Sequence, residues 1–223
     1  MKSLEELQLC IIKINTMKNI FVINGGQHFA HSGGAFNKTL TQWTADFLLE
    51  HQLEIRVTNI NDDFIATEEV EHFKWADLII YNTPIWWFQL PNRMKKYIDE
   101  VFTAGHQNGI YSSDGRSRKN PAINYGTGGL MHDTKYMVNS TWNAPDTAFT
   151  LPGEFFNETS VDDGVLFGFH RMNAFTGMEK IQGFHFHDLE KNATSERIEN
   201  YKNDYYKHLN QVFSKVLNSE MVS

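Results

Sequence analysis

The stretch Ile20-Phe-Val-Ile-Asn-Gly-Gly-Gln-His-Phe-Ala-His-Ser32 decides the fold of this chain. Four apolar residues run without a break, a glycine-rich turn follows at once, and an amphipathic helical pattern begins at residue 40. An uninterrupted apolar run is typical of a strand covered on both faces, because strands of parallel sheets are buried between helices. The stretch therefore predicts the first strand–loop–helix unit of a parallel sheet.

The same alternation recurs along the rest of the chain. Patterns of buried strands occupy residues 20–23, 53–57, 78–81, 136–138 and 181–187, and helical patterns occupy residues 40–49, 94–102, 165–175 and 198–216. Strands that alternate with helices form βαβ units and a parallel sheet. We expect one α/β domain over residues 17–223, a doubly wound five-stranded parallel sheet with helices on both faces.

The composition of the 223 residues excludes several classes of protein. With 41% hydrophobic and 21% charged residues, the chain is ordinary for a globular domain. The net charge of −7 argues against nucleic-acid binding, and no apolar run is long enough for membrane insertion. The single cysteine, Cys10, rules out an intramolecular disulfide and indicates a reducing, cytoplasmic setting. Residues 1–16 lack a signal-peptide pattern, and we expect them to be an N-terminal extension outside the core.

Ligands of doubly wound sheets bind beyond the carboxyl ends of the strands, where three loops are unusual. The first, residues 24–37, is rich in glycine and carries Ser32 ahead of a helix, which predicts an anion cradle. The loop lacks GxxxxGK[ST] and GxGxxG, and the alternative is that Ser32 merely caps the helix. His28 and His31 have no cysteine or glutamate at ligand spacing, so we expect no metal.

The second loop, residues 81–91, holds Trp86, Trp87 and Phe88 between two prolines. Such a run beyond a strand favours a rigid wall for a flat ring, although packing in the core is the alternative for each aromatic residue.

The third loop, residues 139–145, offers hydroxyl, indole and amide donors from Thr141, Trp142 and Asn143. Upstream of it, Tyr125 leads a glycine-rich turn over residues 125–130, for which a mobile loop is the alternative interpretation.

Several of these segments, in this order, resemble one known family. They are Phe29-Ala-His-Ser32, Lys74-Trp-Ala-Asp77, Pro84 with Trp86-Trp87, Lys96-Tyr-Ile-Asp-Glu-Val-Phe-Thr-Ala-Gly-His106, Ser113-Asp-Gly-Arg116, Tyr125-Gly-Thr-Gly-Gly-Leu130 and Ser140-Thr-Trp-Asn-Ala-Pro145. The series resembles the flavodoxin-like NAD(P)H quinone reductases, most closely the bacterial modulator of drug activity B group. The resemblance spans residues 18–213, nearly the whole chain.

The resemblance implies a flavodoxin-like fold and a homodimer that holds FAD without a covalent bond near the subunit interface, with FMN as the less favoured cofactor. It implies two-electron reduction of quinones, or of other flat aromatic acceptors, by NADPH or NADH in a ping-pong sequence of hydride transfers. A flavodoxin-type electron carrier and a regulatory subunit of a membrane transporter are the alternatives. The length of the chain and the Trp-Trp-Phe wall favour the reductase.

The resemblance also implies site residues, at the positions of this chain that match the motifs of the family. The pyrophosphate side falls on His31, Ser32, Phe36, Asn37 and Thr39, the isoalloxazine ring on Pro84, Ile85, Trp86, Trp87 and Phe88, and its surroundings on Tyr125, Thr141, Trp142, Asn143 and Ala144. Tyr125 is also the candidate catalytic residue, which orients the quinone or the hydride donor. Ile85 departs from the family pattern, which has glycine at that position.

Overall fold

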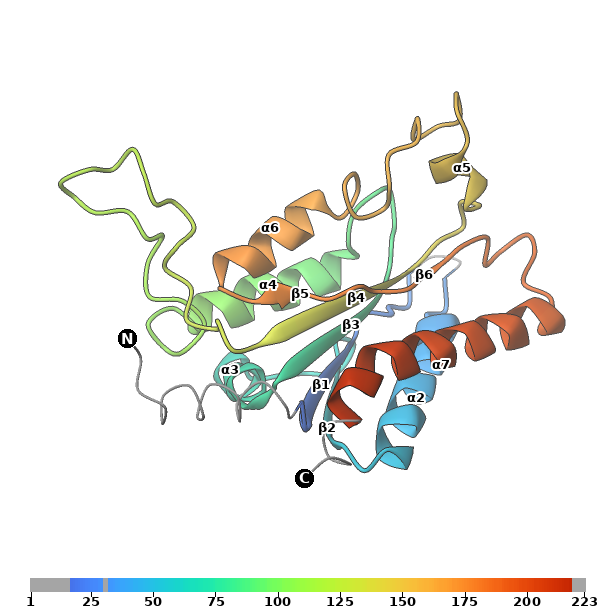
Figure 1. The fold of residues 1–223 in the computed structure, drawn as a ribbon, viewed down its shortest axis with the longest axis horizontal. Coiled ribbons are helices and arrows are strands. Elements are labelled where there is room, and N and C mark those ends of the chain that lie inside the picture. Colours follow the sequence, from blue (N-terminus) through green and yellow to red (C-terminus); the bar gives the residue numbers. More distant parts are fainter. Residues whose placement is uncertain (1–16, 30–31, 218–223) are drawn as a thin grey trace.

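The computed structural model describes residues 17–29 and 32–217. The predicted extension over residues 1–16 and the candidate His31 lie outside the described residues. The elements are β1 (Asn19–Asn24), α2 (Ala35–Glu50), β2 (Glu54–Asn59), α3 (Ala66–Trp75), β3 (Leu78–Pro84), α4 (Asn92–Ala104), β4 (Lys135–Thr141), α5 (Thr147–Thr150), α6 (Phe167–Phe175), β5 (Glu179–Lys180), β6 (His185–Phe186) and α7 (Ser195–Leu217) (Figure 1).

All strand pairs are parallel, and the sheet order is β2-β1-β3-β4-β5, with β6 also paired to β4. The predicted fifth strand over residues 181–187 is wrong in detail, because two short strands, β5 and β6, share that position. The ladder breaks because the Asn139 side chain accepts the Phe184 backbone N–H at 2.9 Å, in place of a backbone carbonyl. The predicted class, a doubly wound parallel sheet, is confirmed.

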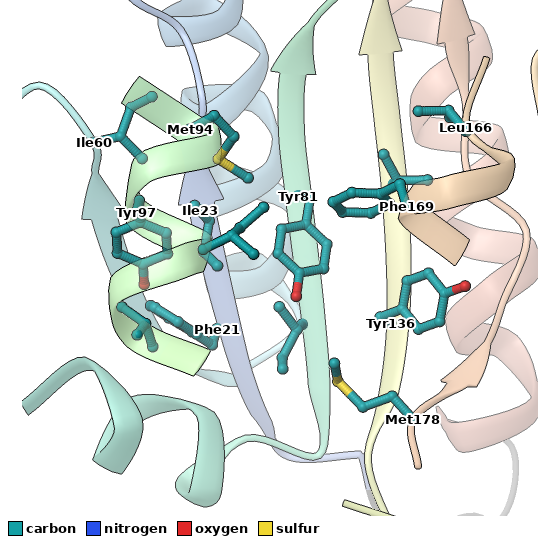
Figure 2. Close-up of a cluster of buried hydrophobic side chains, with 14 of the residues drawn as sticks. Phe21, Ile23, Ile60, Tyr81, Met94, Tyr97, Tyr136, Leu166, Phe169 and Met178 are labelled. Carbon is teal, nitrogen blue, oxygen red and sulfur yellow. The ribbon is translucent and has the colours of Figure 1, made fainter. Parts of the chain in front are cut away.

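Two hydrophobic cores lie on opposite faces of the sheet. Helices α3, α4 and α6 cover one face, where Tyr81 and Tyr136 of the sheet lie beside Phe169 and Met94 of the helices (Figure 2). Helices α2 and α7 cover the other face (Figure 1). The sequence patterns missed α3, because Val70 and Phe73 are the only hydrophobic residues buried along it, too few to form a visible period.

A buried polar network ties α2 and α7 to the centre of the sheet. The Asn139 side-chain amide donates to the Asn82 amide oxygen and to the Tyr205 hydroxyl, each at 2.9 Å. The Asn82 amide in turn lies 3.3 Å from the hydroxyls of Thr41 and Thr44. Because every member of this network is paired, it fixes α2 and α7 in one position against β3 and β4.

The loops that follow β1, β3 and β4 lie together at the carboxyl ends of the strands, here called the carboxyl edge of the sheet. The sequence predicts the ligand site at this edge. Residues 106–134 precede β4 and project at the opposite edge (Figure 1). Within the described part of the chain, no helix is both long and apolar enough to cross a membrane.

Candidate functional site

Helix α2 begins at the carboxyl edge of the sheet without a side-chain cap from the described residues. Its N-cap is Gly34, in the left-handed conformation at φ 66°. Ser32 does not cap the helix, because it forms a backbone bridge with Phe29. The capping interpretation of Ser32 is therefore wrong. An uncapped helix start leaves N–H donors available for an anion.

Asn37, in the first turn of α2, carries a buried donor with no partner. The side chain is only 3% exposed, and its amide oxygen accepts a hydrogen bond from the Thr141 hydroxyl at 3.0 Å. Its amide nitrogen has no hydrogen-bond partner among the described residues. A buried donor without a partner costs about 1–3 kcal/mol, so this donor set suits an added acceptor such as a phosphate oxygen.

The glycine-rich loop is shaped by close approach to α2. A Cβ atom on Gly26 would lie 2.6 Å from the Asn37 Cβ, so only glycine fits at that position. Asn24 fixes the loop, because its side-chain oxygen accepts the Gly26 N–H at 2.9 Å. The remaining pyrophosphate candidates lie in the first turns of α2: Phe36 packs against Trp43 and Phe186, and Thr39 is exposed.

The loop after β3 ends in a strained two-residue turn. Trp86 and Gln89 exchange both backbone hydrogen bonds at 2.9 Å, and between them Trp87 and Phe88 have φ values of 49° and 62°. This is the geometry of a type I′ turn, which favours asparagine and glycine. Aromatic residues in the left-handed region store about 1–3 kcal/mol of strain each, and such strain clusters at functional sites.

The turn holds its two central side chains outward. Trp87 is 92% exposed and Phe88 is 45% exposed, so the alternative of core packing is wrong for both. Trp86 is half-buried and packs against Phe29 with ring centroids 5.5 Å apart. The loop therefore presents an aromatic surface at the carboxyl edge, as a wall for a flat ring requires.

The loops after β3 and β4 are joined at their start. Pro84 is paired with Thr141 in the ladder, and the Ile85 N–H donates to the Thr141 carbonyl oxygen at 3.0 Å. The Ile85 side chain is buried in the core. The structure thus brings Pro84, Ile85 and Thr141 together, next to Asn37.

The donors expected on the third loop are paired within the chain. The Thr141 hydroxyl donates to Asn37, and the indole N–H of the buried Trp142 donates to the Ser140 hydroxyl at 2.7 Å. The Asn143 amide donates to Glu190. The backbone carbonyl of Ala144, which is partly buried, accepts the Asp188 N–H at 3.0 Å.

Ser140 links Trp142 to a charged cluster behind the site. An indole N–H can only donate, so the Ser140 hydroxyl accepts from Trp142, and it also shares a hydrogen bond with the His185 Nδ1, 2.7 Å away. The other ring nitrogen of His185, Nε2, lies 3.5 Å from the Asp162 carboxylate. Burial by itself raises a carboxyl pKa, but hydrogen bonds from His170, His185 and Lys180 outweigh it and hold the pKa of Asp162 well below its ordinary value.

Tyr125 is the one described candidate that the structure does not bring to the carboxyl edge. Its ring contacts Phe175 at the end of α6, with centroids 5.8 Å apart, and nearby the Met131 N–H donates to the Thr176 carbonyl oxygen. These residues lie at the amino end of β4, which is seven residues long. Tyr125 therefore lies roughly 20 Å, about the length of the strand, from the loops after β3 and β4 in the same chain.

Two further features of the edge were missed by the sequence reasoning. Phe29 and Phe155 are both exposed, and the Phe155 ring stacks on Phe88 with centroids 5.5 Å apart at 22°. The adjacent pair Phe155-Phe156 beside Gly153 was the available signal, by the same logic that singled out Trp86 and Trp87. In addition, a cavity of about 890 Å³ runs between α4 and α6, from Ile85 at the edge to Phe175.

The parallel strands in the order β2-β1-β3-β4-β5, with helices on both faces and a candidate ligand site beyond their carboxyl ends, define a doubly wound α/β protein of the flavodoxin kind. The chain belongs to the Flavodoxin-like fold family, whose model matches residues 18–209. It is 44% identical over 194 residues to an uncharacterized protein of Schizosaccharomyces pombe, across 87% of this chain and 96% of that protein. It is 41% identical over 196 residues to the NADPH:quinone oxidoreductase MdaB of Haemophilus influenzae, across 87% of this chain and 99% of that protein.

Solved structures share the fold at low sequence identity. A putative quinone reductase from Klebsiella pneumoniae superposes with a TM-score of 0.68 at 17% identity, over 89% of this chain and 85% of that one. The general stress protein 14 of Treponema denticola, in complex with FMN, gives a TM-score of 0.58 at 17% identity, over 87% and 98%. At these identities the likeness shows the fold alone.

Proposed function

We propose that this chain reduces quinones with electrons from NADPH or NADH, using a non-covalently bound FAD. The observation that carries the proposal is the combination of an exposed aromatic turn, Trp87-Phe88, with an Asn37 donor and a helix start that find no side-chain partner among the described residues. The first suits a flat ring and the second suits a phosphate. The relative from Haemophilus influenzae, which is named as an NADPH:quinone oxidoreductase, supports the same activity.

FAD fits the residues present at the edge. The α2 start would hold the pyrophosphate through backbone N–H groups and Asn37, while Trp86, Trp87 and Phe88 would line the isoalloxazine ring. When bound, FAD supplies the capacity to take two electrons from a nicotinamide and pass them to a quinone. FMN would use the same wall with a single phosphate, so the cofactor must be identified directly.

The chain's own residues hold and orient the reactants. The hydrogen bond from Ile85 to Thr141 joins the two ring-lining loops, so the wall moves as one piece. The nicotinamide and the quinone would lie in turn beside the exposed Trp87, and this shared place makes the kinetics ping-pong.

Tyr125 serves this site from a second copy of the chain. Because Tyr125 lies about one strand length away in its own chain, its role in orienting the quinone requires a homodimer that brings it to the partner's carboxyl edge. The proposal therefore includes a homodimer, with the cofactor near the interface. It also places the protein in the cytoplasm, in keeping with its single cysteine, Cys10.

The proposal is tested with the absorbance spectrum of the purified protein. We expect a yellow protein that releases FAD, loses its colour with NADPH under anaerobic conditions and regains it with menadione. Release of FMN with no quinone turnover would favour an electron carrier. A colourless protein that takes up no added flavin would contradict the proposal.

A further inference from the structure

The segment that follows β4 builds an aromatic series from the core to the surface. The buried Trp142 packs edge-to-face on Phe149 at 5.0 Å, and Phe149 stacks on Phe156 at 3.9 Å with the rings 7° from parallel. Phe156 then contacts Phe155 and Phe88 at 5.0 Å and 5.7 Å. The series ties the segment between α5 and α6, which arches beyond the carboxyl end of β4, to the turn after β3 (Figure 1).

The outer end of this series is Phe155, which is 73% exposed. Its neighbour Phe156 is anchored, because its N–H donates to the Ala148 carbonyl oxygen at 3.1 Å. Phe155 therefore presents a large apolar ring to solvent on an anchored support, beside the exposed Trp87-Phe88 turn. Exposed apolar surface of this kind marks interaction sites, and an aromatic ring offers a flat face to a flat ligand.

The backbone around Phe155 repeats the unusual geometry of the Trp87 turn. Asn157 and Glu158 have φ values of 48° and 59°, and the Thr159 N–H closes the turn on the Phe156 carbonyl oxygen at 2.9 Å. A second turn with two left-handed residues thus follows Phe155-Phe156, and the Phe88–Phe155 stack joins this segment to the turn after β3. Strain of this kind persists where the surrounding structure demands it, most often at binding sites.

The segment from residue 144 to residue 169 is also strongly acidic. Between residues 144 and 169 the sequence contains no lysine or arginine, but it contains Asp146, Glu154, Glu158, Asp162 and Asp163. Asp162 is paired with Lys180 and two histidines, and Asp163 accepts a hydrogen bond from Ser160. Glu154 directly precedes Phe155 and Glu158 follows three residues later, and both are exposed, so a ligand that stacks on this ring meets negative charge.

We propose that residues 146–158 form the acceptor-binding wall, in which Phe155 stacks on the flat acceptor while Glu154 and Glu158 select neutral or cationic acceptors against anionic ones. The inference rests on the proposed function. The reaction served is NADPH + H⁺ + quinone → NADP⁺ + quinol, in which the quinone gains two electrons and two protons. A sulfonated quinone of the same ring size is disfavoured, because the two carboxylates repel its negative charge.

Binding of two matched probes to the oxidised holoprotein tests the wall without turnover. The probes are 1,4-naphthoquinone and its 2-sulfonate, measured by calorimetry. We expect Phe155→Ala to weaken binding of the neutral probe about three- to tenfold. The control, Leu49→Ala, removes an exposed apolar side chain from the far end of α2 and should change nothing. Equal affinities for the wild type and Phe155→Ala would overturn the inference.

Charge removal tests the selection. We expect the double variant Glu154→Gln/Glu158→Gln to bind the sulfonate about fivefold more tightly at low salt, with the gain fading as ionic strength rises. The neutral probe should bind as before, and Glu54→Gln, at the opposite edge of the sheet, should leave both affinities unchanged. An equal gain for both probes, or none, would overturn the selective role.

The same samples separate this inference from the proposed function. Loss of colour on addition of NADPH reports the nicotinamide step alone, and the control variants Leu49→Ala and Glu54→Gln should keep the wild-type rate. A wild type that binds the naphthoquinones but is not reduced by NADPH would contradict the proposed function, whereas the inference that residues 146–158 bind the acceptor would not be contradicted. A wild type that is reduced by NADPH but binds neither probe would contradict the wall alone.

Discussion

The Thr141 hydroxyl donates to the Asn37 amide oxygen over 3.0 Å and thereby joins two residues that are 104 positions apart. Thr141 ends β4, and Asn37 lies in the first turn of α2. The bond holds the predicted phosphate cradle at a fixed distance from the ring-lining loops. It also leaves the Asn37 amide nitrogen as the free donor of the pair.

Replacing Thr141 with valine removes this bond at nearly constant shape. The Asn37 amide oxygen then stays buried without a partner, so we expect the free energy of unfolding to fall by about 1–3 kcal/mol. Urea titration measures the loss, and FAD affinity should fall with it. Thr67→Val, at an exposed position of α3, is the control. An unchanged unfolding midpoint in Thr141→Val would show that the bond contributes nothing.

Trp87→Gly should separate stability from activity. Glycine adopts φ 49° freely, and the tryptophan side chain buries almost nothing, so we expect stability to stay the same or rise by up to about 1 kcal/mol. Quinone turnover should fall, because the turn after β3 loses its most exposed aromatic ring. Trp142→Ala is the contrasting variant, since a buried tryptophan lost from the core costs about 3–5 kcal/mol. A clear drop in the thermal midpoint of Trp87→Gly would count against stored strain.

The Asp162 cluster should make stability depend on acid pH. Its carboxylate has a pKa well below the ordinary 3.8, because hydrogen bonds from His170, His185 and Lys180 outweigh burial. A lowered folded-state pKa means that the contribution of Asp162 is complete above pH 4 and is lost as the pH falls below that value. We expect the stability difference between the wild type and Asp162→Asn to shrink between pH 4 and pH 2 in urea titrations. Asp163→Asn should show no such trend.

Tyr125→Phe should lower quinone turnover roughly tenfold, because the phenol would no longer orient the acceptor, while the cofactor content stays unchanged. Tyr206→Phe, on α7, should leave turnover intact. The second copy enters through mixing. Dimers formed from Tyr125→Phe and Trp87→Gly chains should contain one fully intact site and regain about half of the wild-type rate per dimer. Mixed samples no faster than the average of their parents would exclude a role for Tyr125 across the interface.

The elements that the sequence predicted best are those whose burial is uniform. Strands β1, β3 and β4 are covered on both faces, so their apolar runs are continuous. The fifth position was not predictable in detail, because its break depends on a side chain from β4, Asn139, that accepts the Phe184 N–H. Helix α3 was not predicted, because it buries too few apolar residues to show a helical period.

The site was predictable as a place but not as a set of contacts. Trp87 and Trp142 both follow strands and carry the same chemistry in the sequence, yet one is exposed and the other is buried with its N–H paired to Ser140. The difference arises from an unfavourable turn conformation at Trp87, which no residue preference in that loop signals. The partnership of Asn37 with Thr141 likewise requires the assembled sheet.

The hydroxyl of Tyr205 has a consequence for how this protein is made. It lies on the last helix and completes the hydrogen bonds of Asn139 in the middle of the sheet. The central strands are synthesised before Tyr205. Until α7 has been made, the Asn139 amide therefore lacks its second hydrogen-bond acceptor. A nascent chain that ends before α7 therefore lacks the Tyr205 partner of Asn139, so the polar network that holds α2 against the sheet is completed only after α7 has been synthesised.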